Sequence, residues 1–116
     1  MTGTPGDVMR AMVAAFATGV VADVVHPDYL DHQGLDGERP LRGPEGFARV
    51  VEVARRAYAE LDVTIVDLVE GPDRAAARIA WRGVRATGEI TERETIDIVR
   101  VEDGRAVEHW GGRSSP

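Results

Sequence analysis

Apolar positions in the N-terminal half of the chain recur at helical spacing. Between Asp7 and Ala17 they lie three or four residues apart, so that they share one side of a helix. A second helical pattern begins at Gly43-Pro44-Glu45 and extends to about Glu60. Proline at the first helical position and an acidic first turn both favour a helix start. The short apolar segment Val20–Val25, which runs into a His-Pro-Asp turn signal, predicts a brief further helix. Three helices are therefore expected.

After Leu61 the pattern becomes typical of strands, with many β-branched residues and turn signals between the runs. The predicted strands cover Tyr29–Gln33, Leu61–Val69, Ala75–Ala86, Arg93–Val101 and Arg105–Gly111. Helices followed by an antiparallel meander define an α+β fold, in which helices cover one face of a curved sheet and a pocket lies between the layers. Residues 1–112 are expected to form this single domain, residues 113–116 a disordered tail, and Gly34–Gly43 a loop that flanks a site or an edge.

The Asp103-Gly104 turn is the strongest short hairpin signal, and it predicts which residues of the last two strands face one another. A two-residue turn places Asp97 opposite Trp110 on one face of the sheet. It places Ile98 opposite His109 on the other face. A register shift of one residue would reverse these assignments.

Composition and charge narrow the class of protein. The 116 residues are 43% hydrophobic and 29% charged, which is ordinary for one globular domain. Twenty acidic and fourteen basic side chains give a net charge of −6, which argues against nucleic acid as a partner. The N-terminus lacks the pattern of a signal peptide, and no apolar run is long enough to span a membrane. A cytoplasmic protein without a membrane partner is expected.

The missing residue types exclude several kinds of catalysis. There is no Cys or Lys, and the only two serines, Ser114 and Ser115, lie at the C-terminal end. Thiol, lysine and serine nucleophiles are therefore excluded, which leaves general acid–base chemistry. No phosphate-binding motif is present, so no nucleotide cofactor is expected. The three histidines lack the helical spacing of a metal site, and no metal is expected.

Asp97 is the leading candidate for acid–base chemistry. It lies within TIDIVRV, a run otherwise suited to a buried strand. Beside an indole its carboxylate would lose solvation, which would raise its pKa and make it a general base or acid near neutral pH. The alternative is that Asp97 lies on the surface, or pairs with Arg78, Arg82 or Arg100.

Four further side chains have both a functional and a structural interpretation. His32 is either an acid–base group or a hydrogen-bonded structural histidine. Tyr29 either donates a hydrogen bond to a substrate oxygen or buries its ring. Trp81 and Trp110 either line a hydrophobic ligand cavity or pack in the sheet.

Three segments together resemble the SnoaL-like polyketide cyclase family of the nuclear transport factor 2-like superfamily. They are HPDYLDH, the run that begins RGPEGFARVVEVARRAYAELDVTIV, and IDIVRVEDGRAVEHWG. The resemblance spans about Met9 to Gly112. It implies a cone-shaped fold in which three helices pack against a strongly curved antiparallel sheet around an apolar pocket, commonly as a homodimer.

The resemblance also implies a chemistry. Similar cyclases close rings in aromatic polyketide biosynthesis by intramolecular aldol reactions without a cofactor, with an aspartate as general acid–base. That aspartate lies in an I-D-I-x-R strand, which here places it at Asp97. The family's T-H-T-G-like segment is Arg85-Ala86-Thr87-Gly88 in this chain, so its histidine is absent. Arg85, His32 or His109 would have to replace it.

The sequence thus predicts a cofactor-independent cyclase that acts on a hydrophobic, carbonyl-bearing or polyene small molecule in secondary metabolism. The expected catalytic residues are Asp97, His32 and Tyr29. The expected substrate-binding residues are Trp81, Trp110, Arg85 and His109. Two alternatives stay open. One is a non-catalytic ligand-binding or oligomerisation domain, and the other is an isomerase or epoxide hydrolase of the same superfamily. The latter would need a second carboxylate near Asp97, from Asp31 or Glu94, and epoxide hydrolysis also an Arg between two acids.

Overall fold

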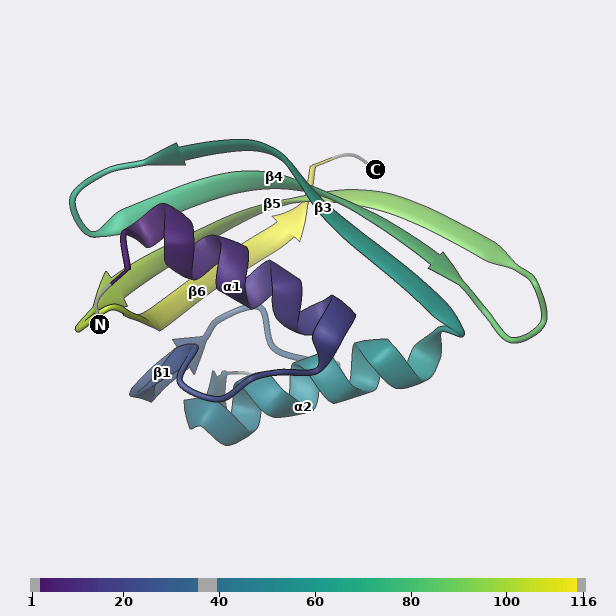
Figure 1. Cartoon of the computed structure of the whole chain (residues 1–116), viewed down its shortest axis with the longest axis horizontal. Helices are drawn as coiled ribbons and strands as arrows, with labels where there is room; N and C mark the ends of the chain where they lie inside the picture. The colour runs from purple at the N-terminus through teal and green to yellow at the C-terminus, as the bar shows by residue number, and fades with distance from the viewer. Residues whose placement is uncertain (1–2, 36–39, 115–116) are drawn as a thin grey trace.

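The computed structural model describes residues 3–35 and 40–114. Its elements are α1 (Pro5–Thr18), β1 (Val25–Asp31), β2 (Leu41–Arg42), α2 (Gly43–Ala57), β3 (Glu60–Glu70), β4 (Arg74–Val84), β5 (Ile90–Glu102) and β6 (Arg105–Arg113). The six strands form one sheet in the order β2-β1-β6-β5-β4-β3, antiparallel except that β1 runs parallel to β6. The sheet curves over α1 and α2, which lie on its concave side (Figure 1). The predicted α+β class is confirmed.

Local sequence signals fix both ends of α1. Thr4 and Asp7 form a capping box, in which each side chain accepts a hydrogen bond from the backbone of the other. Gly19 ends the helix in the left-handed conformation, with φ at 76°. The guanidinium of Arg55 on α2 then donates to two carbonyls of the last turn of α1, at 3.0 and 2.6 Å. This contact links the two helices above the sheet.

The helix expected over Val20–Val25 is wrong, and the described residues contain two helices rather than three. The chain makes a turn after Val21 and enters β1 at Val25. Asp23 takes a positive φ of 61°, which no helix continues through. The segment is also short and rich in valine, whose branched side chain favours strands.

The register of the last hairpin also differs from the prediction. A bulge at Val107 shifts the pairing by one residue, so that Asp97 faces Gly111 and Ile98 faces Trp110. The predicted Asp97–Trp110 and Ile98–His109 pairs are therefore wrong. The shift places Asp97 and His109 together on the concave face of the sheet, and it places Trp110 on the convex face.

β5 begins at Ile90, so the connection predicted over Thr87–Glu92 is shorter than expected. Arg113 ends β6, whereas residues 115–116 of the predicted tail lie outside the described part of the chain. No described helix is long and apolar enough to cross a membrane.

The core lies between the two helices and the concave face of the sheet. Its largest fully buried side chains are those of Tyr29, Met9 and Val99. Phe47 of α2 packs edge-on against the Tyr29 ring, with 6.1 Å between the ring centroids. The core thus holds β1 and α2 together. The hydroxyl of Tyr29 points out of this core to Asp31, which belongs to the site described next.

Candidate active site

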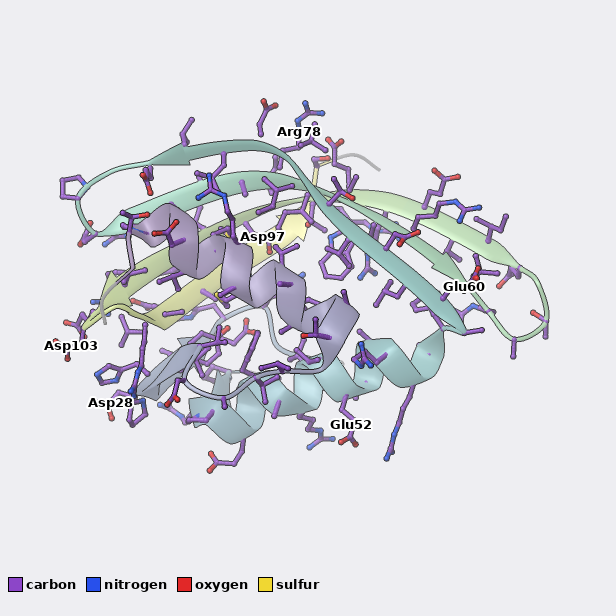
Figure 2. All side chains as sticks on the ribbon, viewed as in Figure 1. Asp28, Glu52, Glu60, Arg78, Asp97 and Asp103 are labelled. Atoms are coloured by element: carbon purple, nitrogen blue, oxygen red, sulfur yellow. The ribbon has the colours of Figure 1, made fainter. Side chains whose placement is uncertain are left out.

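A cavity of about 620 Å³ lies between the helices and the concave face of the sheet. Apolar side chains from α1, α2 and β4 form most of its wall, namely Met9, Met12, Val13, Phe16, Phe47, Val50, Val53, Ile79 and Trp81. Its polar floor consists of Tyr29, Asp31, Gln33, Thr95, Asp97 and His109. Figure 2 shows Asp97 on the helix side of the sheet, whereas Arg78 projects from the outer side. The cavity therefore places a few polar groups at the base of an apolar space.

The centre of the floor is an Asp31–His109–Asp97 relay. His109 Nδ1 lies 2.9 Å from Asp31 Oδ1, and His109 Nε2 lies 2.8 Å from Asp97 Oδ1. The three side chains come from β1, β6 and β5, and each is at most 11% exposed. The parallel pairing of β1 with β6 brings Asp31 beside His109, and the β6 bulge brings His109 beside Asp97.

The relay holds His109 as a cation at neutral pH. Burial alone would lower the pKa of this imidazole, but the hydrogen bonds and negative charges of Asp31 and Asp97 outweigh burial and raise the pKa to about 9. A protonated imidazole donates from both ring nitrogens, which matches the two carboxylate contacts. The relay therefore carries one positive charge between two negative ones when both aspartates are ionised.

Asp31 is held in its ionised form by several donors. Burial raises the pKa of its carboxyl, but the hydrogen bond and charge of His109 and two backbone N–H groups lower it below the usual value. Those N–H groups belong to Gln33 and Gly34, at 3.0 and 3.3 Å from Oδ1. The Tyr29 hydroxyl donates to Oδ2 at 3.2 Å. Burial, followed by the charge of Asp31, raises the pKa of Tyr29, so this hydroxyl stays protonated as the donor.

Asp97 has a second support on its other oxygen. The hydroxyl of Thr95 donates to Asp97 Oδ2 at 2.6 Å, and the indole N–H of Trp81 donates to the Thr95 hydroxyl at 2.9 Å. The Trp81 indole proton and the Thr95 hydroxyl proton are therefore both used in this series of hydrogen bonds. Both oxygens of Asp97 are oriented by neighbours while the residue lines the cavity.

The comparisons with known proteins bear on this arrangement. The sequence model of the family described as SnoaL-like polyketide cyclase matches residues 6–112. The chain belongs to the SnoaL-like polyketide cyclase family. It is 31% identical over 115 residues to aklanonic acid methyl ester cyclase DnrD of Streptomyces peucetius, which covers 89% of this chain and 79% of that protein. It is 30% identical to aklanonic acid methyl ester cyclase DauD of Streptomyces sp. (strain C5), in a match that covers 89% of this chain and 71% of that protein.

A solved structure also resembles this fold over nearly its whole length. The crystal structure of wild-type IdmH from Streptomyces antibioticus superimposes with a TM-score of 0.82 at 27% identity, covering 97% of this chain and 93% of that one. The family expected from the sequence is thus confirmed, together with its curved sheet around a pocket.

Within this SnoaL-like fold, the structure brings some of the predicted site residues together and separates others. Asp97, His109, Tyr29 and Trp81 line the cavity. Arg85 lines a smaller hollow that adjoins it.

His32 and Trp110 are not among the residues that line the cavity. The bulge turns Trp110 to the convex face, where its ring stacks on His32 with 5.2 Å between the centroids. His32 also lies 2.6 Å from a carboxylate oxygen of Glu108. These two residues therefore form a separate cluster on the outside of the sheet.

Two of the three arginine partners considered for Asp97 are engaged elsewhere, and Arg82 lies in register with Glu92 on the convex face. Arg78 pairs with Asp67 and Glu94 on the convex face, and Arg100 pairs with Glu108. The second carboxylate near Asp97 is Asp31 rather than Glu94, and a histidine rather than an arginine lies between the two acids.

The sequence did not indicate Thr95 or the role of His109 as the link between the two aspartates. Thr95 lies two residues before Asp97, on the same face of a strand, which is the one signal that points to it. Among the described residues, no group of three His, Cys, Asp or Glu side chains is arranged to hold a metal ion.

Proposed function

We propose that this chain is a cofactor-independent cyclase that closes a ring in a hydrophobic, carbonyl-bearing polyketide-type molecule, with Asp97 as the acid–base group. One observation supports this most directly. Asp97 lies on the floor of an apolar cavity and is oriented through both oxygens by His109 and Thr95. A positioned carboxylate in such a space is suited to proton transfer at carbon.

The proposed reaction is an intramolecular aldol step. The Asp97 carboxylate takes a proton from the carbon next to a substrate carbonyl, which leaves an enolate. The enolate carbon attacks a second carbonyl of the same molecule, so that a C–C bond forms and that carbonyl oxygen becomes an alkoxide. The alkoxide takes the proton back from Asp97. The product is an isomer of the substrate, so the step consumes no oxidant, reductant or cofactor.

His109 acts as the electrostatic support of Asp97 in this scheme. Its imidazolium fixes one carboxylate oxygen, and Asp31 keeps the imidazolium charged and oriented. The enolate oxygen needs a hydrogen-bond donor, and Gln33, whose side chain carries an amide N–H, lines the same cavity. Tyr29, a donor expected from the sequence, directs its hydroxyl to Asp31 and takes a positioning role.

The apolar walls of the cavity would orient the substrate for ring closure. A flexible chain with two carbonyls must bring them together before a ring can close, and a cavity that holds the folded conformer removes much of that entropic cost. The space is lined by Met9, Met12 and Phe16 of α1 and by Val50 and Val53 of α2. These side chains would exclude water from the enolate.

The two alternative functions receive less support. A binding domain predicts an Asp97 satisfied by an arginine on the outer face, whereas Asp97 lies in the cavity with a histidine partner. Epoxide hydrolysis calls for an arginine between two acids, and His109 occupies that place here. A ketosteroid-type isomerase would share the first proton transfer and differ in having no C–C bond formed.

The test uses the compound named in the relatives' descriptions, aklanonic acid methyl ester, with the wild-type protein and the variant Asp97→Asn. In deuterated water, mass spectrometry follows deuterium uptake next to the carbonyl, and chromatography follows an isomeric ring-closed product. Uptake and ring closure by wild type, with both lost in Asp97→Asn, would support the proposal. Full turnover by Asp97→Asn contradicts it, and uptake without ring closure points to an isomerase instead.

We also propose that two copies associate through the convex face of the sheet. Val69, Ala76, Ile98 and Trp110 face one another across β3, β4, β5 and β6 and form an apolar row. Val69 is 69% exposed and Ile98 38% exposed in the single chain. Light scattering coupled to size exclusion tests this, since Ile98→Glu should convert a dimer to a monomer. A wild-type monomer contradicts the proposal.

A further inference from the structure

A second, smaller hollow adjoins the main cavity at the end of the sheet where the β4–β5 hairpin extends beyond α2 (Figure 1). Its volume is about 220 Å³. Both spaces are lined by Ala54, Tyr58, Trp81 and Arg93, so the hollow continues the main cavity. A long molecule with one end at Asp97 would reach it.

On β5, acidic and basic side chains alternate between the two faces of the sheet at this end. On β5, Arg93 shares the concave face with Thr95 and Asp97, because side chains alternate along a strand. Glu92 and Glu94 take the intervening convex positions, in register with Arg82 and Ala80 of β4, although Glu92 also borders the hollow. The sequence Glu-Arg-Glu therefore presents its cation inward.

Two more guanidinium groups line the hollow. Arg85 follows β4 on the concave side and pairs with Glu89 in the adjoining turn, at 3.1 Å. Arg113 lies opposite Thr95, two residues along β5 from Arg93. Within the described part of the chain, no carboxylate lies within ion-pair distance of Arg93 or Arg113. The hollow thus has a net positive charge in a protein whose overall charge is −6.

Aromatic rings hold two of these cations in place. The Arg93 guanidinium lies over the Trp81 ring and that of Arg85 over the Tyr58 ring, each 5.0 Å from the centroid. A guanidinium that stacks by its face keeps its N–H edges available for a carboxylate. The Thr91 hydroxyl donates to the Tyr58 hydroxyl at 3.2 Å, which leaves the Tyr58 proton for another acceptor. The stacking fixes the cations without neutralising them.

We propose that this hollow is an anion subsite that binds a carboxylate at the outer end of the substrate. The inference rests on the proposed function, because it assumes a substrate that also occupies the main cavity. It makes the preferred substrate class an elongated hydrophobic acid, with reacting carbonyls beside Asp97 and a carboxylate between Arg93, Arg85 and Arg113. An ester such as the compound of the ring-closure test would instead rely on the main cavity alone. Two-point binding of that carboxylate would fix which carbonyl reaches Asp97.

The test measures binding of two matched probes, anthraquinone-2-carboxylate and anthraquinone-2-carboxamide, by titration calorimetry with the full chain. Both are flat three-ring molecules, and they differ in one negative charge. The wild type should bind the carboxylate about tenfold more tightly, as expected for a charge-assisted contact. Arg93→Gln should reduce that preference to less than about threefold, and the double variant Arg93→Gln/Arg85→Gln should abolish it.

Arg82→Gln is the matched control, because Arg82 lies on the same strand as Trp81 but on the opposite face. It removes the same charge from the chain and should keep the tenfold preference. Circular dichroism and thermal unfolding confirm that each variant is folded. Equal affinity for the two probes in the wild type, no binding of the carboxylate, or the same loss of preference in Arg82→Gln would each overturn the proposal.

The variant Asp97→Asn separates this inference from the proposed function. Carboxylate preference together with lost ring closure in Asp97→Asn supports both. Lost ring closure without any carboxylate preference in the wild type overturns the subsite alone. A carboxylate preference in a protein whose Asp97→Asn variant keeps full turnover supports the subsite and removes the assigned role of Asp97.

Discussion

Two histidine–carboxylate clusters lie on opposite faces of the same sheet, and they differ in burial and in the number of partners. His109 lies between Asp31 and Asp97 on the concave face, with 11% of its side chain exposed. His32 lies beside Glu108 on the convex face, with 37% exposed. The outer contact is the shorter one, 2.6 Å against 2.8 and 2.9 Å.

The comparison shows that distance alone does not determine what such a contact does. At the outer cluster, solvent screens the charges, and Glu108 shares its oxygens between His32 and Arg100, which together lower its pKa. At the inner relay, each side chain is at most 11% exposed, so solvent screens the charges far less and the loss of one partner is costly. The inner relay should therefore govern both stability and chemistry, and the outer cluster neither.

Removing the charge of the inner carboxylate should have the largest effect. In Asp97→Asn the side chain keeps its size but loses its basicity, and ring closure should slow by roughly 10²- to 10⁴-fold, the usual contribution of a general base. The control is Glu108→Gln, which removes the outer carboxylate and should change the rate by less than about twofold. Steady-state kinetics of both variants decide this, and equal losses would contradict the comparison.

Replacing each histidine tests the same contrast through stability. His109→Gln leaves two buried carboxylates without a cation between them and should reduce the free energy of unfolding by about 3–5 kcal/mol. His32→Gln removes an exposed partner and should cost no more than about 1 kcal/mol. Urea denaturation measures both. A His109→Gln protein as stable as His32→Gln would mean that the relay contributes no net stability.

The sequence predicted the order of elements but not the contacts that build the relay. The Gly-Pro start of α2 and the Asp103-Gly104 turn are local signals, and the structure uses both of them. The helix predicted over Val20–Val25 is wrong because the apolar pattern of this segment is too short to distinguish a helix from a turn and strand. The fold class survives this error, since it depends on the longer elements.

The candidate site was predicted in part, for a physical reason. Asp97 was identified because a lone carboxylate in an apolar strand is unusual. The predicted pairing of Asp97 with Trp110 is wrong because the bulge at Val107 has no local signature, and one extra residue exchanges the faces of His109 and Trp110. Asp31 reaches the site only through the parallel pairing of β1 with β6, a long-range contact that no short window of sequence contains.

The two histidines should also differ in how they affect the pH dependence of the free energy of unfolding. The pKa of His109 is raised to about 9 from 6.5, so its stabilising effect is complete below about pH 6.5 and is lost as the pH rises through about 9. The pKa of Asp31 is lowered, so its effect is present above pH 3.8 and is lost as the pH falls below that value.

Thermal unfolding from about pH 3 to 10 should therefore show a loss of a few kcal/mol at the alkaline end, at about 1.4 kcal/mol per pKa unit. His109→Gln should flatten the alkaline limb, and His32→Gln should leave it in place. An alkaline limb that persists unchanged in His109→Gln would assign it to another group.

The smallest expected effect concerns two adjacent glycines at the end of β6. A Cβ at Gly111 would overlap Asp97 Oδ1 and would lie 2.7 Å from Gln33 Oε1 and 3.2 Å from the His109 ring, whereas a Cβ at Gly112 meets nothing within 4 Å. Gly111→Ala should thus cost about 1–3 kcal/mol in the free energy of unfolding, as overpacking does. Gly112→Ala should change it by less than about 0.5 kcal/mol.

The two alanine variants also compare the faces of the sheet in catalysis, because Gly111→Ala adds a methyl group on the concave face and Gly112→Ala adds one on the convex face. If the relay positions Asp97 for catalysis, Gly111→Ala should reduce kcat by displacing the carboxylate, while Gly112→Ala keeps the wild-type kcat. A Gly111→Ala protein that is destabilised yet keeps the wild-type kcat would show that the packing around Asp97 matters for folding and not for proton transfer.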